Sequence, residues 1–343
     1  MSTPPRVALI GCGRIGRVHA RTLASRRDLC EFAIVADSFP DVAEHTAASF
    51  GVPAWTVDAE EAIANRSVDA VILASSTETH APYIELASRY GKSIFTEKPI
   101  ALDLESTERV LSAAANAGVR LQVGFQRRFD PGYAAAKAAI ERGELGTLEM
   151  IHDVMRDPAP PPAGYLAQSG GLYRDMAIHN FDSVRWLMGE EPCEIFAMAS
   201  ALVSDDIRAA NDVDTSVVTL RFPSGALASI ENSRRSGFGY DVRTEIFGSA
   251  GALMVGESRD LPLRRYTSAG VTEDHQYFFL ERFDDAYRLE IIAFLTAVRD
   301  DTPVTVTGQD GRAALQLAVA AEESLRQGRP ISLQTTEVLY AQS

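Results

Sequence analysis

The chain has 343 residues, of which 46% are hydrophobic and 23% are charged, and this is typical of a globular protein with two domains and excludes a disordered or fibrous one. The formal net charge of -14, from 33 basic and 47 acidic residues, provides no electrostatic footprint for nucleic acid or an anionic membrane surface. No apolar run approaches the roughly 20 residues of a membrane span and no signal peptide is evident, so we expect a cytoplasmic protein whose partners are small molecules and further copies of itself.

A glycine-rich turn follows the first predicted strand. The strand covers residues 6–10, and a helical pattern begins after the turn and continues to Ala24. Strand, GxGxxG and helix in this order are the fingerprint of dinucleotide binding, in which the glycines permit a tight turn, approach of the backbone to a pyrophosphate, and close packing of helix on strand. The helix N-terminus offers unpaired N–H groups to the phosphates. The residues of this turn are Gly11, Cys12, Gly13, Arg14, Ile15 and Gly16.

An acidic residue follows the second predicted strand. The strand covers residues 32–36, and Asp37 comes about twenty residues after the last glycine, where a carboxylate binds the adenosine ribose hydroxyls. Asp37 would repel a 2′-phosphate, and no arginine follows it closely to accept one. The sequence therefore predicts NAD in preference to NADP.

Helices and strands continue to alternate up to residue 125. Helices are predicted at 41–50, 59–65 and 104–117, and strands at 70–74, in the segment that leads to Lys98, and at 121–125. This order predicts a Rossmann doubly wound parallel sheet in which ligands bind beyond the carboxyl ends of the strands. One interpretation of residues 75–80 is a loop over the nicotinamide, with Ser75, Thr77 and His80 at the cofactor; the other is that His80 begins the helix at 81–90.

Lys98 stands between Glu97 and Pro99 at the end of a predicted parallel strand. Proline restricts the preceding residue to an extended backbone and could permit a cis bond. At this edge of the sheet an ammonium group can donate to a substrate oxygen and stabilise a developing alkoxide, and Glu97 lies beside the predicted cofactor position. The alternative is an ordinary surface lysine ahead of a turn.

The pattern changes after residue 125. A helix is predicted at 132–142, and β-type runs follow at 148–155, 194–202, 214–222, 226–233, 243–247 and 252–255. We expect a Rossmann domain over 1–125 and an α+β domain with a mostly antiparallel open sheet over 126–343. Helices at 281–299 and 309–327 could pack back on the first domain, and the polar loop 232–240 could reach a cleft. An outer sheet face without helices would suit pairing with another subunit.

The segment from Arg174 predicts a helix with a titratable face. A step of 100° per residue would place Asp175, His179, Asp182 and Trp186 on one stripe, with the apolar residues on the opposite arc. A histidine one turn from a carboxylate that can orient it is a candidate general base. The alternative is a solvated helix face.

No metal site is predicted. Cys12, Cys30 and Cys193 lack the spacing of metal ligands, and the six histidines form no HExxH-type pair. We interpret the cysteines as small buried hydrophobic residues.

Several motifs together resemble the Gfo/Idh/MocA oxidoreductase family. They lie at residues 11–16, 97–99, 124–130 and 170–179, in the order of the family, and the similarity covers nearly the whole chain. Segments at 156–158, 175–182, 232–235 and 239–241 are similar to the branch that acts on inositol. Related dehydrogenases of sugars and of scyllo-inositol share most of these segments.

The resemblance implies that Lys98, Asp175 and His179 are catalytic, and it implies a tetramer that associates through the open sheet. It implies reversible NAD-dependent oxidation of a cyclic polyol, with myo-inositol and its 2-ketone expected; scyllo-inositol or another sugar alcohol is the alternative. A non-catalytic NAD-binding regulator is the rival from another class. The positions that resemble polyol-binding residues are Arg127, Asp157, Asp182 and Tyr240.

Overall fold

The computed structural model describes residues 4–256 and 263–333, and contacts divide the chain into two units. Unit 1 comprises residues 1–131 and 283–315, and unit 2 comprises residues 132–282 and 316–343. Helix α11 (Asp284–Asp300) therefore groups with unit 1, and helix α12 (Gly308–Gln327) has residues in both units. Among the residues so described, no helix combines the length and the hydropathy that crossing a membrane requires.

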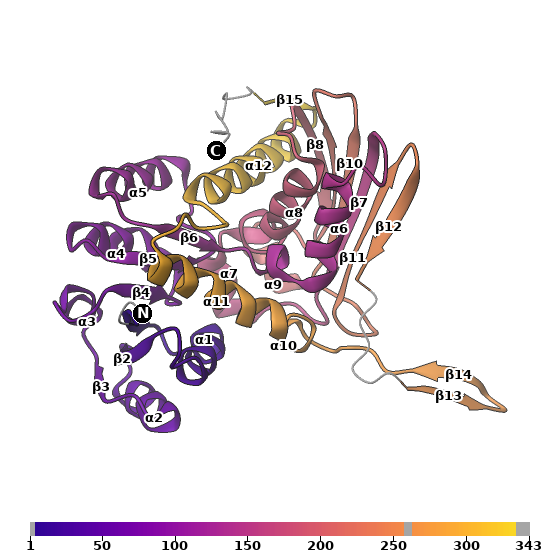
Figure 1. Ribbon diagram of the computed structural model, residues 1–343. Coiled ribbons are helices and arrows are strands. Elements are labelled where there is room, and N and C mark those ends of the chain that lie inside the picture. The colour runs from indigo at the N-terminus through magenta and orange to yellow at the C-terminus, as the bar shows by residue number, and fades with distance from the viewer. Residues whose placement is uncertain (1–3, 257–262, 334–343) are drawn as a thin grey trace. The chain divides into compact units, whose positions relative to one another are not determined.

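Unit 1 contains a six-stranded parallel sheet with the order β3-β2-β1-β4-β5-β6 (Figure 1). The order reverses between β1 and β4, and this reversal is the switch point of a doubly wound fold. The predicted Rossmann fold is confirmed. The strands are β1 (Arg6–Ile10), β2 (Glu31–Ala36), β3 (Ala54–Thr56), β4 (Ala70–Leu73), β5 (Ser93–Glu97) and β6 (Leu121–Gly124). The helices between them are α1 (Arg14–Ser25), α2 (Pro40–Phe50), α3 (Ala59–Ala64), α4 (Thr77–Arg89) and α5 (Leu104–Ala117).

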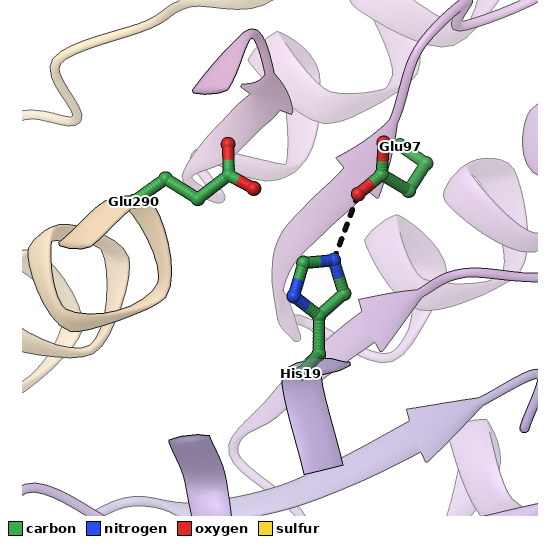
Figure 2. Close-up of side chains that lie close together, drawn as sticks. All are labelled: His19, Glu97 and Glu290. Atoms are coloured by element: carbon green, nitrogen blue, oxygen red, sulfur yellow. Dashed lines mark hydrogen bonds and ion pairs between the residues drawn. The ribbon is translucent and has the colours of Figure 1, made fainter. Parts of the chain in front are cut away.

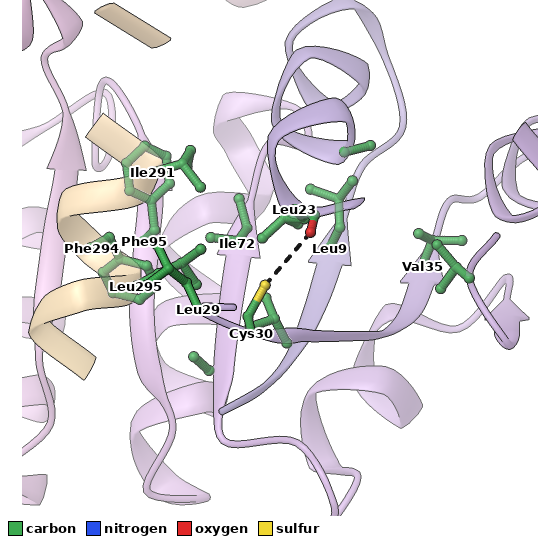
Figure 3. Packing of buried hydrophobic residues seen from close by; sticks show 14 of the residues in the cluster. Leu9, Leu23, Leu29, Cys30, Val35, Ile72, Phe95, Ile291, Phe294 and Leu295 are labelled. Atoms are coloured by element: carbon green, nitrogen blue, oxygen red, sulfur yellow. Dashed lines mark hydrogen bonds between the residues drawn. The ribbon is translucent and has the colours of Figure 1, made fainter. Parts of the chain in front are cut away.

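The core of unit 1 joins the sheet to helices from both of its chain segments (Figure 3). Central strands contribute fully buried apolar residues such as Leu9 and Phe95, and α11 inserts Ile291, Phe294 and Leu295 into the same cluster. The rings of Phe95 and Phe294 meet edge to face with their centroids 5.9 Å apart. Because α11 carries this apolar stripe, it packs in unit 1 although it follows the sheet of unit 2 in the sequence.

Unit 2 contains a seven-stranded sheet with the order β12-β11-β7-β10-β9-β8-β15. Strands β7 and β10 pair in parallel, and the other pairs of this sheet are antiparallel, so the predicted mostly antiparallel sheet is confirmed. A separate hairpin of β13 and β14 has every residue exposed. The strands are β7 (Leu148–Arg156), β8 (Glu194–Ser200), β9 (Thr215–Arg221), β10 (Leu227–Ser233), β11 (Asp241–Gly248), β12 (Gly251–Val255), β13 (Arg264–Thr267), β14 (Gly270–Glu273) and β15 (Ile331–Ser332).

The two faces of this sheet differ. Inward side chains such as Ile151 and Ile230 are fully buried, and helix α8 (Ile178–Met188) packs against β7 on that side. The opposite face carries large apolar side chains that are 40% to 68% exposed. We call it the outer face and define it by Met150, Met198, Val217, Leu227, Phe247 and Met254. The other helices are 3₁₀ helix η1 (Gln126–Phe129) in unit 1, α6 (Pro131–Glu141), α7 (Ala163–Ser169), α9 (Asp205–Ala209) and α10 (Phe279–Arg282).

The expected helix from Arg174 is wrong in its first turns. Residues Tyr173–Ala177 form a π-helix, η2, and the α-helix begins at Ile178. The wider turn changes the angular relation between Asp175 and His179 that a regular α-helix would give. The stripe of titratable residues is not open to solvent, because α8 is buried almost all round and Asp182 has no exposed surface.

Candidate active site

The glycine turn has the shape that a dinucleotide requires. Gly11 has φ +91°, and a Cβ there would lie 2.6 Å from the carbonyl oxygen of Ala74. A Cβ on Gly16 would lie 2.0 Å from the carbonyl oxygen of Gly11, so only glycine lets α1 pack this closely. A Cβ on Gly13 would meet nothing within 4 Å, and no side chain caps α1 at this residue. The turn therefore leaves open space beside Gly13 at the start of α1, which fits a pyrophosphate.

Asp37 ties this turn to the end of β2. Its Oδ2 accepts the backbone N–H of Cys12 at 2.8 Å, and its Oδ1 accepts that of Phe39 at 3.0 Å. Each carboxylate oxygen has a second lone pair, so the group can still accept from a diol. The residues at this edge of the sheet thus fit the adenosine end of NAD.

Replacing Asp37 by serine is expected to raise the KM for NAD about tenfold and to change the KM for NADP less, because the acceptor for the ribose hydroxyls is lost together with the charge that repels a 2′-phosphate. Initial rates with both cofactors measure this. Asp41→Ser, at an exposed position in the first turn of α2, is the matched control. An unchanged NAD/NADP preference in Asp37→Ser would contradict the assignment.

Residues 77–80 are helical, so the interpretation of this segment as a loop is wrong. Helix α4 begins at Thr77, and His80 lies inside it with 1% of its surface exposed. The Nδ1 of His80 lies 2.8 Å from the carbonyl oxygen of Pro99, and its Nε2 lies 3.2 Å from that of Ser75. Burial lowers the pKa of His80. The imidazole of His80 therefore lies between the segment after β4 and the residue after Lys98.

Lys98 directly follows β5, is partly buried, and is joined to Pro99 by a cis peptide bond. It therefore lies at the carboxyl end of a central parallel strand, which is the predicted edge. Arg127 lies in η1, with 1% of its surface exposed. The adjacent Arg128 is held by the carboxylate of Asp310 at 2.8 Å.

Glu97, the neighbour of Lys98 in the chain, is one of three titratable side chains that lie close together (Figure 2). His19 of α1 and Glu97 of β5 form a hydrogen bond of 2.7 Å between Nε2 and Oε1. Glu290 of α11 points toward them, is fully buried, and has no hydrogen-bond partner for either oxygen among the described residues. One possible ligand atom from each residue lies within 4.8 Å of the others, so the group could hold a metal ion. Burial and then the charge of Glu97 raise the pKa of Glu290 well above its ordinary value, which favours a proton at this place.

Replacing Glu290 by glutamine is expected to make stability less dependent on pH. An acid whose folded-state pKa is raised binds more protons when folded, so it costs stability as the pH rises through and above its unfolded value of about 4.3. The midpoint of chemical unfolding of the variant should therefore rise relative to that of the wild type as the pH increases above about 4.3.

Glu44→Gln, at an exposed position on α2, is the control for this comparison. A bound metal ion would give the opposite result, with Glu290→Gln losing stability at neutral pH together with the metal measured by mass spectrometry.

In unit 2, an arginine joins two of the predicted site residues. Asp175 Oδ2 accepts from Arg234 Nη2 at 2.8 Å, and its Oδ1 accepts from the hydroxyl of Tyr165 at 2.9 Å. Arg234 Nη1 also donates to Asp157 Oδ2 at 3.2 Å. Arg234 is 3% exposed; burial opposes its charge, but Asp175 and Asp157 raise its pKa. The pair of acids is therefore held around one buried cation.

The remaining predicted residues of unit 2 are buried. His179 is 7% exposed and lies in the first turn of α8. Asp182 lies one turn further along α8, and its Oδ1 is 3.7 Å from Nη1 of Arg185. Tyr240 is 4% exposed; its carbonyl oxygen is 2.8 Å from His275 Nε2, and its ring meets Phe279 edge to face. Because these residues are buried, the start of α8 has no solvent-exposed polar face, and the alternative of a solvated helix face is wrong.

Two residues of this group were missing from the predicted site. Arg234 lies in the polar loop that was expected to reach a cleft, and an arginine that follows a strand end could have suggested a partner for buried acids. Nothing in the sequence indicated that Tyr165 belongs to the site. Its partner Asp175 lies in the next helical segment, and the proline-rich stretch before Tyr165 predicts no regular structure.

Comparisons with known proteins cover almost the whole chain. Residues 5–125 match the model of an oxidoreductase family with an NAD-binding Rossmann fold, and residues 133–254 match that of the GFO/IDH/MocA C-terminal domain. The chain is 42% identical over 329 residues to the inositol 2-dehydrogenase of Rhizobium meliloti (strain 1021), over 96% of this chain and 99% of that protein. It is 41% identical over 330 residues to the myo-inositol 2-dehydrogenase of Thermotoga maritima, over 96% and 98%.

A solved structure adds a bound cofactor to this comparison. The scyllo-inositol dehydrogenase from Lactobacillus casei with bound NAD(H) and scyllo-inositol superimposes with a TM-score of 0.90 at 27% identity, and the match covers 96% of this chain and 99% of that one.

Proposed function

Because the chain belongs to the Gfo/Idh/MocA oxidoreductase family and carries its NAD-binding Rossmann domain, we propose that it oxidises myo-inositol to the 2-keto-inositol. The observation that carries this proposal is the carboxylate of Asp175, fixed by Tyr165 and Arg234 four residues before a buried histidine. The names of relatives that are 41% and 42% identical over nearly their full length support the same substrate.

The residues have distinct roles in this reaction. A hydride leaves a carbinol carbon readily only if the hydroxyl proton leaves to a base, and a ring nitrogen of His179 takes that proton, because imidazole is the side chain suited to general-base work near neutral pH. Asp175 orients the imidazole, and the ammonium of Lys98 donates to the oxygen as negative charge develops there. NAD, when bound, accepts the hydride.

Further residues bind the two reactants. Arg127, Asp157, Asp182 and Tyr240 are assigned to the polyol, because charged and hydroxyl groups match a ring of hydroxyls. His80 contributes to the cofactor site indirectly, by positioning Ser75, because its two ring nitrogens face the carbonyl oxygens of Pro99 and Ser75. The residues assigned to the cofactor are Gly11, Gly13, Arg14, Ile15, Gly16, Asp37, Ser75, Thr77, Glu97 and Lys98.

A panel of polyols tests the proposal, with NADH absorbance as the readout. Myo-inositol should give the highest kcat/KM, and scyllo-inositol or a hexose in first place would move the assignment to another member of the family. NAD binding without oxidation of any member of the panel would favour a non-catalytic regulator instead.

We further propose a cytoplasmic homotetramer that associates through the outer face. Six large apolar side chains, Met150, Met198, Val217, Leu227, Phe247 and Met254, are exposed there at 40% or more. A face of this kind marks an interaction surface. The free state of all three cysteines agrees with a reducing compartment. Light scattering at micromolar concentration tests the assembly, and a monomeric mass would exclude it.

A further inference from the structure

A chain of buried polar side chains lies between α8 and the sheet of unit 2. Asn180 Nδ2 donates to Asp153 Oδ2 at 2.9 Å, and Asn232 Nδ2 donates to Asn180 Oδ1 at 2.9 Å. Thr244 donates to Asp153 Oδ1 at 2.7 Å, and the hydroxyls of Thr244 and Tyr133 lie 2.7 Å apart. All five residues have no exposed surface. The chain joins α8 to α6 and to three neighbouring strands, β7, β10 and β11.

The direction of each hydrogen bond in this chain is fixed by its members. An ionised Asp153 can only accept, so it orients the amide of Asn180 with its nitrogen toward β7. The amide oxygen of Asn180 then faces Asn232, whose amide donates to it. Because a buried polar group that loses its partner is destabilising, a rotated Asn180 is disfavoured.

Asn180 lies directly after His179, close to the end of the π-helix. A step of one residue on an α-helix is a rotation of about 100° and a rise of about 1.5 Å, so the anchor on Asn180 also sets the direction of its neighbour. A π-turn is seldom stable by itself, and it shifts the register of the helix after it. The upstream end is held by Asp212, whose Oδ1 accepts the backbone N–H of Leu172 at 3.1 Å.

We propose that Asn180 is a positioning residue for the reaction: fixed by Asp153 and Asn232, it sets the rotation of α8 and thereby aims the imidazole of His179. The proposal rests on the proposed role of His179 as the base. It gives the buried polar chain a function beyond stability, because it holds α8 in the one rotation that the π-turn produces.

Exchanging the two anchor residues tests this proposal. Asn180→Asp places two carboxylates face to face and breaks this row of hydrogen bonds. Asp153→Asn can keep it, because the new amide can turn its oxygen toward Asn180 and its nitrogen toward the hydroxyl of Thr244, which then donates to Tyr133. In the double variant Asp153→Asn/Asn180→Asp, the amide introduced on β7 donates to the carboxylate introduced on α8, while Thr244 and Asn232 keep acceptors. We expect Asn180→Asp to lower kcat about tenfold to a hundredfold, the size of effect that a misplaced catalytic group produces, and Asp153→Asn to change it by less than about threefold, with little change in the KM for NAD in either.

The double variant is expected to recover to within about threefold of the wild-type kcat, because the two changes act through one contact. Asn211→Asp, at an exposed position after α9, is the matched control for the change of amide to acid. A double variant as slow as Asn180→Asp, or Asn180→Asp with wild-type kcat, would overturn the proposal. So would a loss of kcat that only follows the loss of thermal stability across the series.

A second readout keeps this test separate from that of the proposed function. The rate at which diethyl pyrocarbonate modifies His179, followed by mass spectrometry, should rise in Asn180→Asp and return to the wild-type rate in the double variant. This result is expected even if the wild-type protein oxidises no polyol of the panel. In that case the proposed function would be wrong, but the positioning of His179 by Asn180 would still be supported. Equal modification rates in all four proteins would overturn the positioning role.

Discussion

Lys98→Met is expected to lower kcat by about a thousandfold while the Kd for NAD changes little. Methionine keeps the length and most of the volume of the side chain but removes the ammonium that donates to the developing alkoxide, and loss of one such donor costs about 10²–10³ in rate. Steady-state kinetics with the preferred polyol give kcat, and calorimetric titration gives the Kd for NAD.

Lys137→Met is the matched control, because this lysine lies on α6, 3.8 Å from Glu141 and over the ring of Trp186. Wild-type turnover in Lys98→Met would remove Lys98 from the mechanism. Loss of NAD binding in the same variant would show that Lys98 acts mainly through the cofactor, to which it is also assigned, and not through the alkoxide.

Arg234→Met is expected to lower both stability and turnover. Arg234 is the buried cation between Asp157 and Asp175, and its removal leaves two carboxylates together without compensation. Breaking a buried ion pair in this way costs about 3–5 kcal/mol in the free energy of unfolding. Turnover should fall as well, because Asp175 loses the group that fixes one of its oxygens.

The adjacent Arg235→Met is the control, since Arg235 is exposed. Asp157→Asn added to Arg234→Met should recover part of the lost stability, because one of the two uncompensated charges is removed. Chemical unfolding of the wild type and these variants measures both effects. Equal stability of Arg234→Met and Arg235→Met would show that the two acids do not need this cation.

The sequence predicts unit 1 closely because its signals are local. A strand, a turn and a helix that follow one another in the chain also pack together, so GxGxxG and Asp37 could be placed at the same edge of the sheet. His80 shows where this reasoning ends. Its two partners, the carbonyl groups of Ser75 and Pro99, come together only when neighbouring strands align.

The site in unit 2 depends on contacts between residues far apart in the sequence. Arg234 binds Asp175 across 59 positions, and no periodicity predicts such a pair. The π-turn at Tyr173–Ala177 is equally hidden, because the choice between bonds to the fourth and to the fifth residue depends on distant anchors such as Asp212 and Asp153. The role of α11 in unit 1 required its apolar stripe to be matched with a particular partner sheet.

Strand β7 serves both sides of its sheet with alternate side chains. Met150 belongs to the outer face, whereas Asp153 holds Asn180 on the inner side. Inserting or deleting one residue between them would put both side chains on the same side, so that either the carboxylate turns to the outside or the methionine turns under α8. This strand can change by substitution during evolution, but a change in its length is disfavoured, because a single step would turn over either the apolar residues of the outer face or the carboxylate that holds Asn180.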